Sequence, residues 1–98
     1  MLIQQGDVLF QSLGAVPDGA ARIGDVVAEG EATGHAHRVT GAGAAVLEAE
    51  GHRYVSAPAG ATVVHEEHAP VTLPPGVWDV RKVREYDHFA EEAREVVD

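Results

Sequence analysis

The sequence contains no cysteine, which excludes disulfide bonds and thiolate metal ligands. Aromatic residues make up only 5% of the chain, and Ala and Val supply much of its 45% hydrophobic content, so we expect one modest core. Domains of this size commonly gain extra stability from disulfides, a metal or oligomerisation. Only the last two routes are open to this chain.

Basic residues are also scarce, since seven Lys and Arg stand against sixteen Asp and Glu, for a net charge of -9. This excess repels phosphate backbones and anionic lipid surfaces, so neither nucleic acid nor a membrane is an expected partner. No segment approaches the roughly 20 apolar residues that span a bilayer, and residues 1–7 show no secretory signal pattern. We therefore expect a soluble, cytoplasmic protein.

What the sequence does contain is a regular series of Gly and Pro turn signals, at the spacing of roughly 8 to 12 residues that is typical of all-β domains. The predicted fold class is all-β, a small barrel, sandwich or short β-solenoid of about seven short strands. Residues that favour strands are concentrated in the segments 7–12, 25–31, 35–40, 44–49, 52–57, 61–67 and 77–85.

The last residues follow a different pattern, because Phe89, Ala93 and Val97 fall at helical spacing and Asp87 can cap the first turn. The chain therefore divides into a β domain, 1–86, and a C-terminal helix, 87–98. The helix leaves an apolar stripe that needs a covering surface. Together with the small size of the domain, this stripe predicts a homo-oligomer, either a dimer or a trimer.

Two of the six histidines lie in the string Gly34-His35-Ala36-His37. Side chains at i and i+2 of a strand point to the same face, so His35 and His37 can converge on one ion. Val39 shares that face, and if it points into the core the two imidazoles do so as well. Buried imidazoles need partners, and a metal ion satisfies both at once.

Two further histidines lie in the string His65-Glu66-Glu67-His68. His65 and His68 would face opposite sides of a regular strand, so both can bind one ion only if a bulge or turn intervenes. Pro70 makes such a distortion plausible, and strand parity ranks His65 ahead of His68.

The predicted site binds a divalent transition metal, with zinc as the first choice, through His35, His37, His65 and His68. Glu67 is a candidate fourth ligand, hydrogen-bond acceptor or general base, and Glu66 takes those roles if the register differs by one. His52, beside the hairpin turn at Gly51, and His88 are not expected to be ligands.

Several strings together carry a resemblance to a known group of proteins: GDVL (6–9), EATGHAH (31–37), HEEHAP (65–70), LPPG (73–76) and REY (84–86). In these the chain resembles a family of small uncharacterised bacterial and phage proteins, and the resemblance implies no particular activity. The histidine pair at 35–37 is also similar to the first metal motif of the cupins. That match is partial, because 39–43 contains no carboxylate and the later Pro-x-Gly is absent.

A third similarity is to the γ-class carbonic anhydrases, whose neighbouring subunits share one zinc ion. This chain lacks their hexapeptide repeat, so the resemblance implies only that ligands can come from two subunits.

Three functional hypotheses follow. The first is a metal-dependent hydrolase or lyase for a small-molecule substrate, in which three imidazoles leave a position for a metal-bound water and Glu67 or Glu66 acts as base on that water. The second is a closed, four-ligand structural site without catalysis in an oligomeric scaffold. The third is a metal-free interaction module that exposes Trp78, Tyr86 and the helix to a partner.

Overall fold

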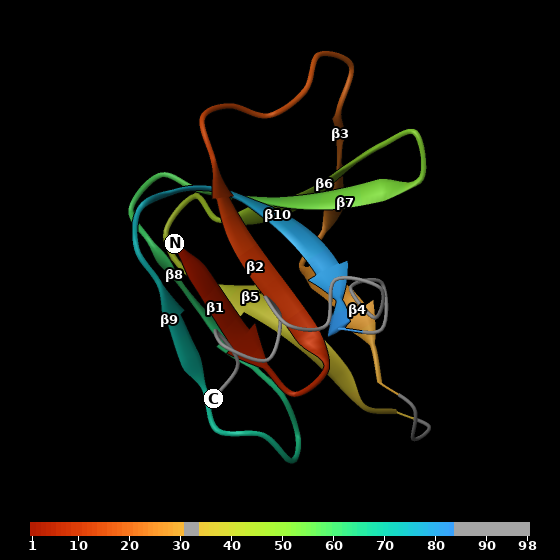
Figure 1. Cartoon of the computed structure of the whole chain (residues 1–98), viewed down its shortest axis with the longest axis vertical. Coiled ribbons are helices and arrows are strands. Elements are labelled where there is room, and N and C mark those ends of the chain that lie inside the picture. The colour runs from red at the N-terminus through yellow and green to blue at the C-terminus, as the bar shows by residue number, and fades with distance from the viewer. Residues whose placement is uncertain (31–33, 84–98) are drawn as a thin grey trace.

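The computed structural model describes residues 1–30 and 34–83, and in this part of the chain the fold is all-β, as predicted. It holds ten strands in two antiparallel sheets (Figure 1). The strands are β1 (Leu2–Gln5), β2 (Val8–Leu13), β3 (Ala21–Gly24), β4 (Val26–Glu29), β5 (Ala36–Thr40), β6 (Ala45–Ala49), β7 (His52–Ala57), β8 (Ala61–Val64), β9 (Val71–Leu73) and β10 (Gly76–Lys82).

The larger sheet has the strand order β1-β2-β10-β7-β6-β3, and the smaller has the order β4-β5-β8-β9. The two sheets are separate, so residues 1–30 and 34–83 do not form the closed barrel that was one of the predicted architectures. The ladders are antiparallel throughout, which also distinguishes the fold from a β-solenoid. Of the three predicted architectures, two packed sheets agree best with the sandwich.

The core lies between the two sheets and is built from alternating inward residues of both. Phe10 and Val55 come from the larger sheet, and Val39, Val63 and Leu73 come from the smaller one. Apart from Phe10 and Trp78, the buried core cluster consists of Val, Ala and Leu side chains, as expected for a chain with few aromatic residues.

Trp78 belongs to this core, with only 2% of its surface exposed, and its Nε1–H donates to the carbonyl oxygen of Pro74. The hypothesis that Trp78 is presented to a partner is therefore wrong. Its indole is buried because its strand, β10, is a central strand of the larger sheet, a position that the sequence alone does not reveal.

Three strands were missed by the sequence analysis: β1, β3 and β9. Each is at most four residues long and lies at the edge of a sheet, where one face is solvated and the periodic signal is weak. The predicted strand 61–67 ends early, at Val64, and the turn that follows carries the second histidine string.

The predicted helix, 87–98, lies outside the described residues, as do Tyr86 and His88. The homo-oligomer that its apolar stripe suggested stays a prediction. Among the described residues, no helix has the length and apolar character needed to cross a lipid bilayer.

Candidate metal centre

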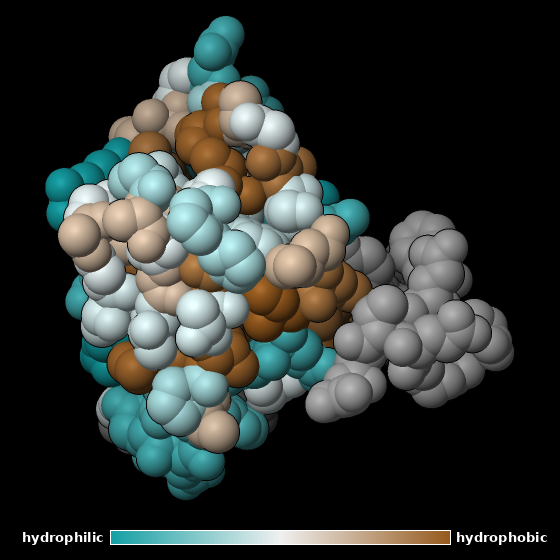
Figure 2. All heavy atoms as spheres, turned by 90° about the vertical axis from the view of Figure 1, so that its left-hand side faces the viewer, coloured by the Kyte–Doolittle hydropathy of each residue, from teal (hydrophilic) through white to brown (hydrophobic). Residues whose placement is uncertain are grey.

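The two histidine strings meet at one end of the molecule, the lower end in Figure 1. The turn between β1 and β2, the start of β5 and the segment that follows β8 all reach this end. In Figure 2, which keeps the same vertical axis, hydrophilic residues gather at the lower end of the visible face. All the segments that approach the site belong to a single chain, so no neighbouring subunit is needed to bring the two strings together.

The register between β5 and β8 explains why His37 and His65 are neighbours. In this antiparallel ladder Arg38 pairs with Val64 and Val39 pairs with Val63. One step further along the same register, position 37 lies opposite position 65, and directly opposite residues share a face of the sheet. The two rings accordingly lie with centroids 4.4 Å apart, as a polar continuation of the Val39–Val63 core pair.

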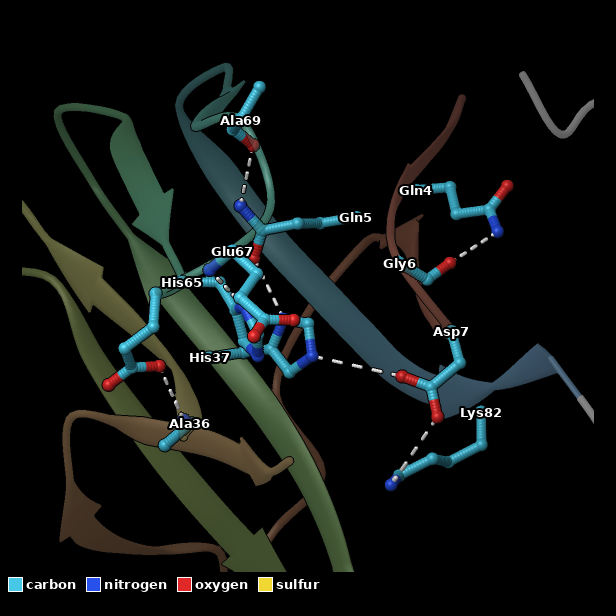
Figure 3. Close-up of polar contacts among 11 residues, drawn as sticks. Gln4, Gln5, Gly6, Asp7, Ala36, His37, His65, Glu67, Ala69 and Lys82 are labelled. Atoms are coloured by element: carbon cyan, nitrogen blue, oxygen red, sulfur yellow. Dashed lines mark hydrogen bonds and ion pairs between the residues drawn. The ribbon is translucent and has the colours of Figure 1, made fainter. Parts of the chain in front are cut away.

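His37 is buried, with 2% of its surface exposed, so the prediction that the two imidazoles point inward with Val39 is confirmed for His37, whereas His35 is only half-buried. Its Nδ1 lies 2.8 Å from Oε1 of Gln5, and its Nε2 lies 3.7 Å from Oδ1 of Asp7 (Figure 3). Burial, followed by the nearby charge of His65, lowers the pKa of His37 to about 4. The imidazole is therefore neutral near pH 7, the form in which histidine binds metals.

His65 and His68 come together because the chain turns after Val64. Their ring centroids are 4.7 Å apart, and the ring of His68 stacks at 6.0 Å on that of His37. The turn that the sequence analysis required for both to reach one ion is present. In this turn the backbone N–H of Glu67 donates to Nδ1 of His65, at 3.0 Å.

Gly6 makes room for His68. It occupies the first position of the two-residue turn between Gln5 and Val8, with a φ of 59°, and an added Cβ there would lie 2.5 Å from Nε2 of His68. A Gly-X pair with positive φ at its first position is typical of a type II′ hairpin turn. The turn thus brings backbone, rather than a side chain, against the imidazole.

The substitution Gly6→Ala is expected to displace His68 and to weaken metal binding, together with a backbone cost of about 1–2 kcal/mol for the left-handed conformation. Gly51→Ala is the matched control, because Gly51 has a φ of 79° and nothing within 4 Å of an added Cβ. Isothermal titration with zinc and urea unfolding of both variants separate the two effects. Equal zinc affinities in the two variants would show that the position of His68 is irrelevant to the ion.

His35 lies at the outer side of the cluster, with its ring 5.6 Å from that of His65. Within the described residues, His35, His65 and Glu66 each offer a ligand atom, and these atoms lie within 4.8 Å of one another. The Nδ1 of His35 is also 3.8 Å from a carboxylate oxygen of Glu67.

The two glutamates of the second string have different surroundings. The Oε1 atom of Glu66 accepts a hydrogen bond from the backbone N–H of Ala36, which lowers the pKa of the Glu66 carboxyl. Its Oε2 atom lies 3.4 Å from Nη1 of Arg38. Glu66 therefore links the 65–68 turn to β5 through these two contacts. Glu67 is 71% exposed and lines the pocket, which leaves it the better placed of the two to act on a bound molecule.

A pocket of about 530 Å³ opens beside this cluster. His52, by contrast, does not line this pocket, and its Nε2 is hydrogen-bonded to Asp79. The pocket is lined by Gln4, Gly6, Asp7, Gly30, His35, His37, His65, Glu67, His68 and Val83.

Gln5 and Asp7 contact His37 but were not predicted as site residues. The string GDVL, which contains Asp7, entered the sequence analysis only as one of the strings shared with the family of small uncharacterised bacterial and phage proteins. A Gly-Asp turn between two strands signals a hairpin, yet local sequence does not reveal which end of the fold that hairpin occupies.

Comparison with known proteins gives one family. Residues 4–83 match the family model described as Domain of unknown function (DUF8820). This range includes both histidine strings and the turn at Gly6. No curated protein and no solved structure matches the chain. The comparisons therefore lend no support to the partial resemblance to cupins.

Proposed function

This chain belongs to the DUF8820 family, a domain of unknown function, and from the geometry of its histidine pocket we propose that it binds a divalent transition metal, with zinc as the first choice. The supporting observation is the gathering of imidazoles from two separate strings. Imidazole nitrogens 2.0–2.1 Å from a tetrahedral ion place the ring centroids about 5 Å apart. Four of the six ring pairs among these histidines have centroid distances of 4.4, 4.7, 5.6 and 6.0 Å, which lie on either side of that value.

The donors also suit this class of ion. With no cysteine in the chain, the available ligands are imidazole nitrogens and carboxylate oxygens, which zinc accepts readily. The proposed ligands come from His35, His37, His65 and His68, with three of them bound to the ion in an open site and all four in a closed one. Asp7, 3.7 Å from Nε2 of His37, adds a carboxylate on the opposite side of that ring from Gln5. Its negative charge favours a cation at this point, although Nζ of Lys82, 3.9 Å from the other carboxylate oxygen, already offsets part of that charge.

Of the two kinds of metal site, we favour an open one that serves a hydrolase or lyase. Three imidazoles leave a coordination position for water, and an ion held in this way lowers the pKa of that water to about 7. The adjoining pocket of about 530 Å³ has room for a small-molecule substrate, and exposed Glu67 is the candidate base. The alternative is a closed structural site, which four imidazoles suffice to build.

Metal binding itself is tested by elemental analysis and zinc titration of protein purified without a histidine tag. We expect one or more equivalents of bound metal per chain. Zinc at a hundredfold excess over its dissociation constant should raise the melting temperature by roughly 10–20 °C. Identical melting curves with zinc and with a chelator would contradict the proposal.

Cobalt substitution distinguishes an open site from a closed one. An open site shows an absorption spectrum that changes when a small anion such as azide displaces the bound water. A closed tetrahedral site gives a spectrum that azide leaves unchanged, and this result would favour the structural alternative.

A further inference from the structure

Gln5 is an unusual residue to find buried, with 2% of its surface exposed at the end of β1. Its side chain reaches from the larger sheet to the smaller one. There the amide nitrogen donates to the carbonyl oxygens of Val63 and Ala69, both at 2.9 Å. Carbonyl oxygens only accept hydrogen bonds, so these two contacts establish which end of the Gln5 amide is the nitrogen.

The other end of the amide is therefore the oxygen, and it faces Nδ1 of His37 at 2.8 Å (Figure 3). Since Oε1 can only accept, Nδ1 of His37 must carry the proton. A neutral imidazole has a single N–H, so Nε2 of His37 holds the free electron pair. That nitrogen is the one on the side of Asp7.

The neighbouring imidazole, His65, does not share the Nδ1–H tautomer of His37. Its Nδ1 accepts the backbone N–H of Glu67, so the proton of the neutral ring lies on Nε2, and coordination of an ion by His65 requires this hydrogen bond to break. Two imidazoles with centroids 4.4 Å apart thus hold opposite tautomers, each set by its own hydrogen-bond partner.

We propose that Gln5 is the positioning residue of the metal site, which holds His37 in the Nδ1–H tautomer and so presents its Nε2 to the ion. The part of this inference that concerns the ion rests on the proposed function. The tautomer is a property of the metal-free chain and can be measured without any metal. Outer hydrogen-bond partners of this kind orient a ligand and raise its basicity, and their loss typically lowers metal affinity by 10- to 100-fold.

A purely structural role for Gln5 makes a different prediction. Its two bonds to Val63 and Ala69 tie β1 to β8 and to the turn after it. A variant that loses both donors would then lose stability and metal affinity together, whatever acceptor it retained. The pair Gln5→Leu and Gln5→Glu separates the two roles. Leucine removes the donors and the acceptor, whereas glutamate has no amide donors but keeps an oxygen that can accept from His37.

The experiment records long-range proton–nitrogen correlation spectra of the metal-free, ¹⁵N-labelled protein near pH 7, with His37 assigned by its absence in His37→Asn. In the wild type we expect the Nδ1–H pattern for His37 and the Nε2–H pattern for His65. Gln5→Leu should lose the Nδ1–H preference of His37, and Gln5→Glu should retain it. Gln11→Leu is the control, because Gln11 is an exposed glutamine of β2 that does not line the pocket.

Zinc titration of the same proteins completes the test. We expect a 10- to 100-fold weaker dissociation constant for Gln5→Leu and an affinity nearer to wild type for Gln5→Glu. An Nε2–H pattern for His37 in the wild type overturns the inference even if no variant folds. Equal losses of zinc affinity in Gln5→Leu and Gln5→Glu also overturn the inference, because they would show that Gln5 acts only through its structural bonds to Val63 and Ala69. If the wild type binds no zinc, the proposed function fails, and the spectra alone decide how Gln5 sets the tautomer.

Discussion

Replacement of His37 by alanine is expected to weaken zinc binding by more than the roughly 100-fold that the loss of an outer hydrogen-bond partner costs. It is also expected to destabilise the metal-free protein by about 2–5 kcal/mol, because the ring is buried and Oε1 of Gln5 loses its donor. Zinc titration measures the first effect and urea unfolding in the presence of chelator measures the second.

His37→Asn separates these two effects. The side-chain amide nitrogen of asparagine lies close to the position of Nδ1 and can still donate to Gln5, but asparagine has no atom in place of Nε2. We therefore expect His37→Asn to lose as much zinc affinity as alanine with a smaller loss of stability. His52→Ala should leave zinc affinity unchanged, since His52 is bonded to Asp79 outside the pocket. Wild-type zinc affinity in His37→Asn would show that Nε2 of His37 does not bind the ion.

The stability of the metal-free protein is expected to depend on pH through the same side chain. The pKa of His37 falls from 6.5 to about 4 on folding, chiefly because the ring is buried. Above pH 6.5 the ring is neutral in both states and contributes no pH dependence. Between pH 6.5 and 4 the unfolded chain binds a proton that the folded chain does not, so stability falls as the pH is lowered. The loss amounts to about 3 kcal/mol and levels off once both states are protonated.

Urea unfolding at a series of pH values, with chelator present throughout, measures this dependence. The other histidines also titrate in this range, so the contribution of His37 is the difference between the wild type and His37→Asn. We expect the variant to lose less stability than the wild type between pH 6.5 and 4. Parallel pH profiles for the two proteins would mean that the wild-type fold accommodates a charged ring at position 37.

The sequence alone predicted an all-β fold, because turn signals and β-branched residues are local features and the longer strands carry them clearly. It also predicted that His37 faces inward, since strand parity ties it to Val39. The edge strands β1 and β9 escaped detection because they are short, with only part of their length packed on the core. The choice among barrel, sandwich and solenoid depended on strand pairings between distant segments, which no local pattern contains.

For the candidate site, the sequence by itself determined which side chains are available: two pairs of histidines with carboxylates beside them and no thiol. Only the tertiary structure decided which of them meet. The β5–β8 register places His37 opposite His65, the turn after Val64 brings His68 back toward both, and the β1–β2 hairpin adds Gln5 and Asp7. The physical reason is that residue type and strand parity are properties of neighbouring residues, whereas register and hairpin placement follow from burying two apolar sheet faces against each other.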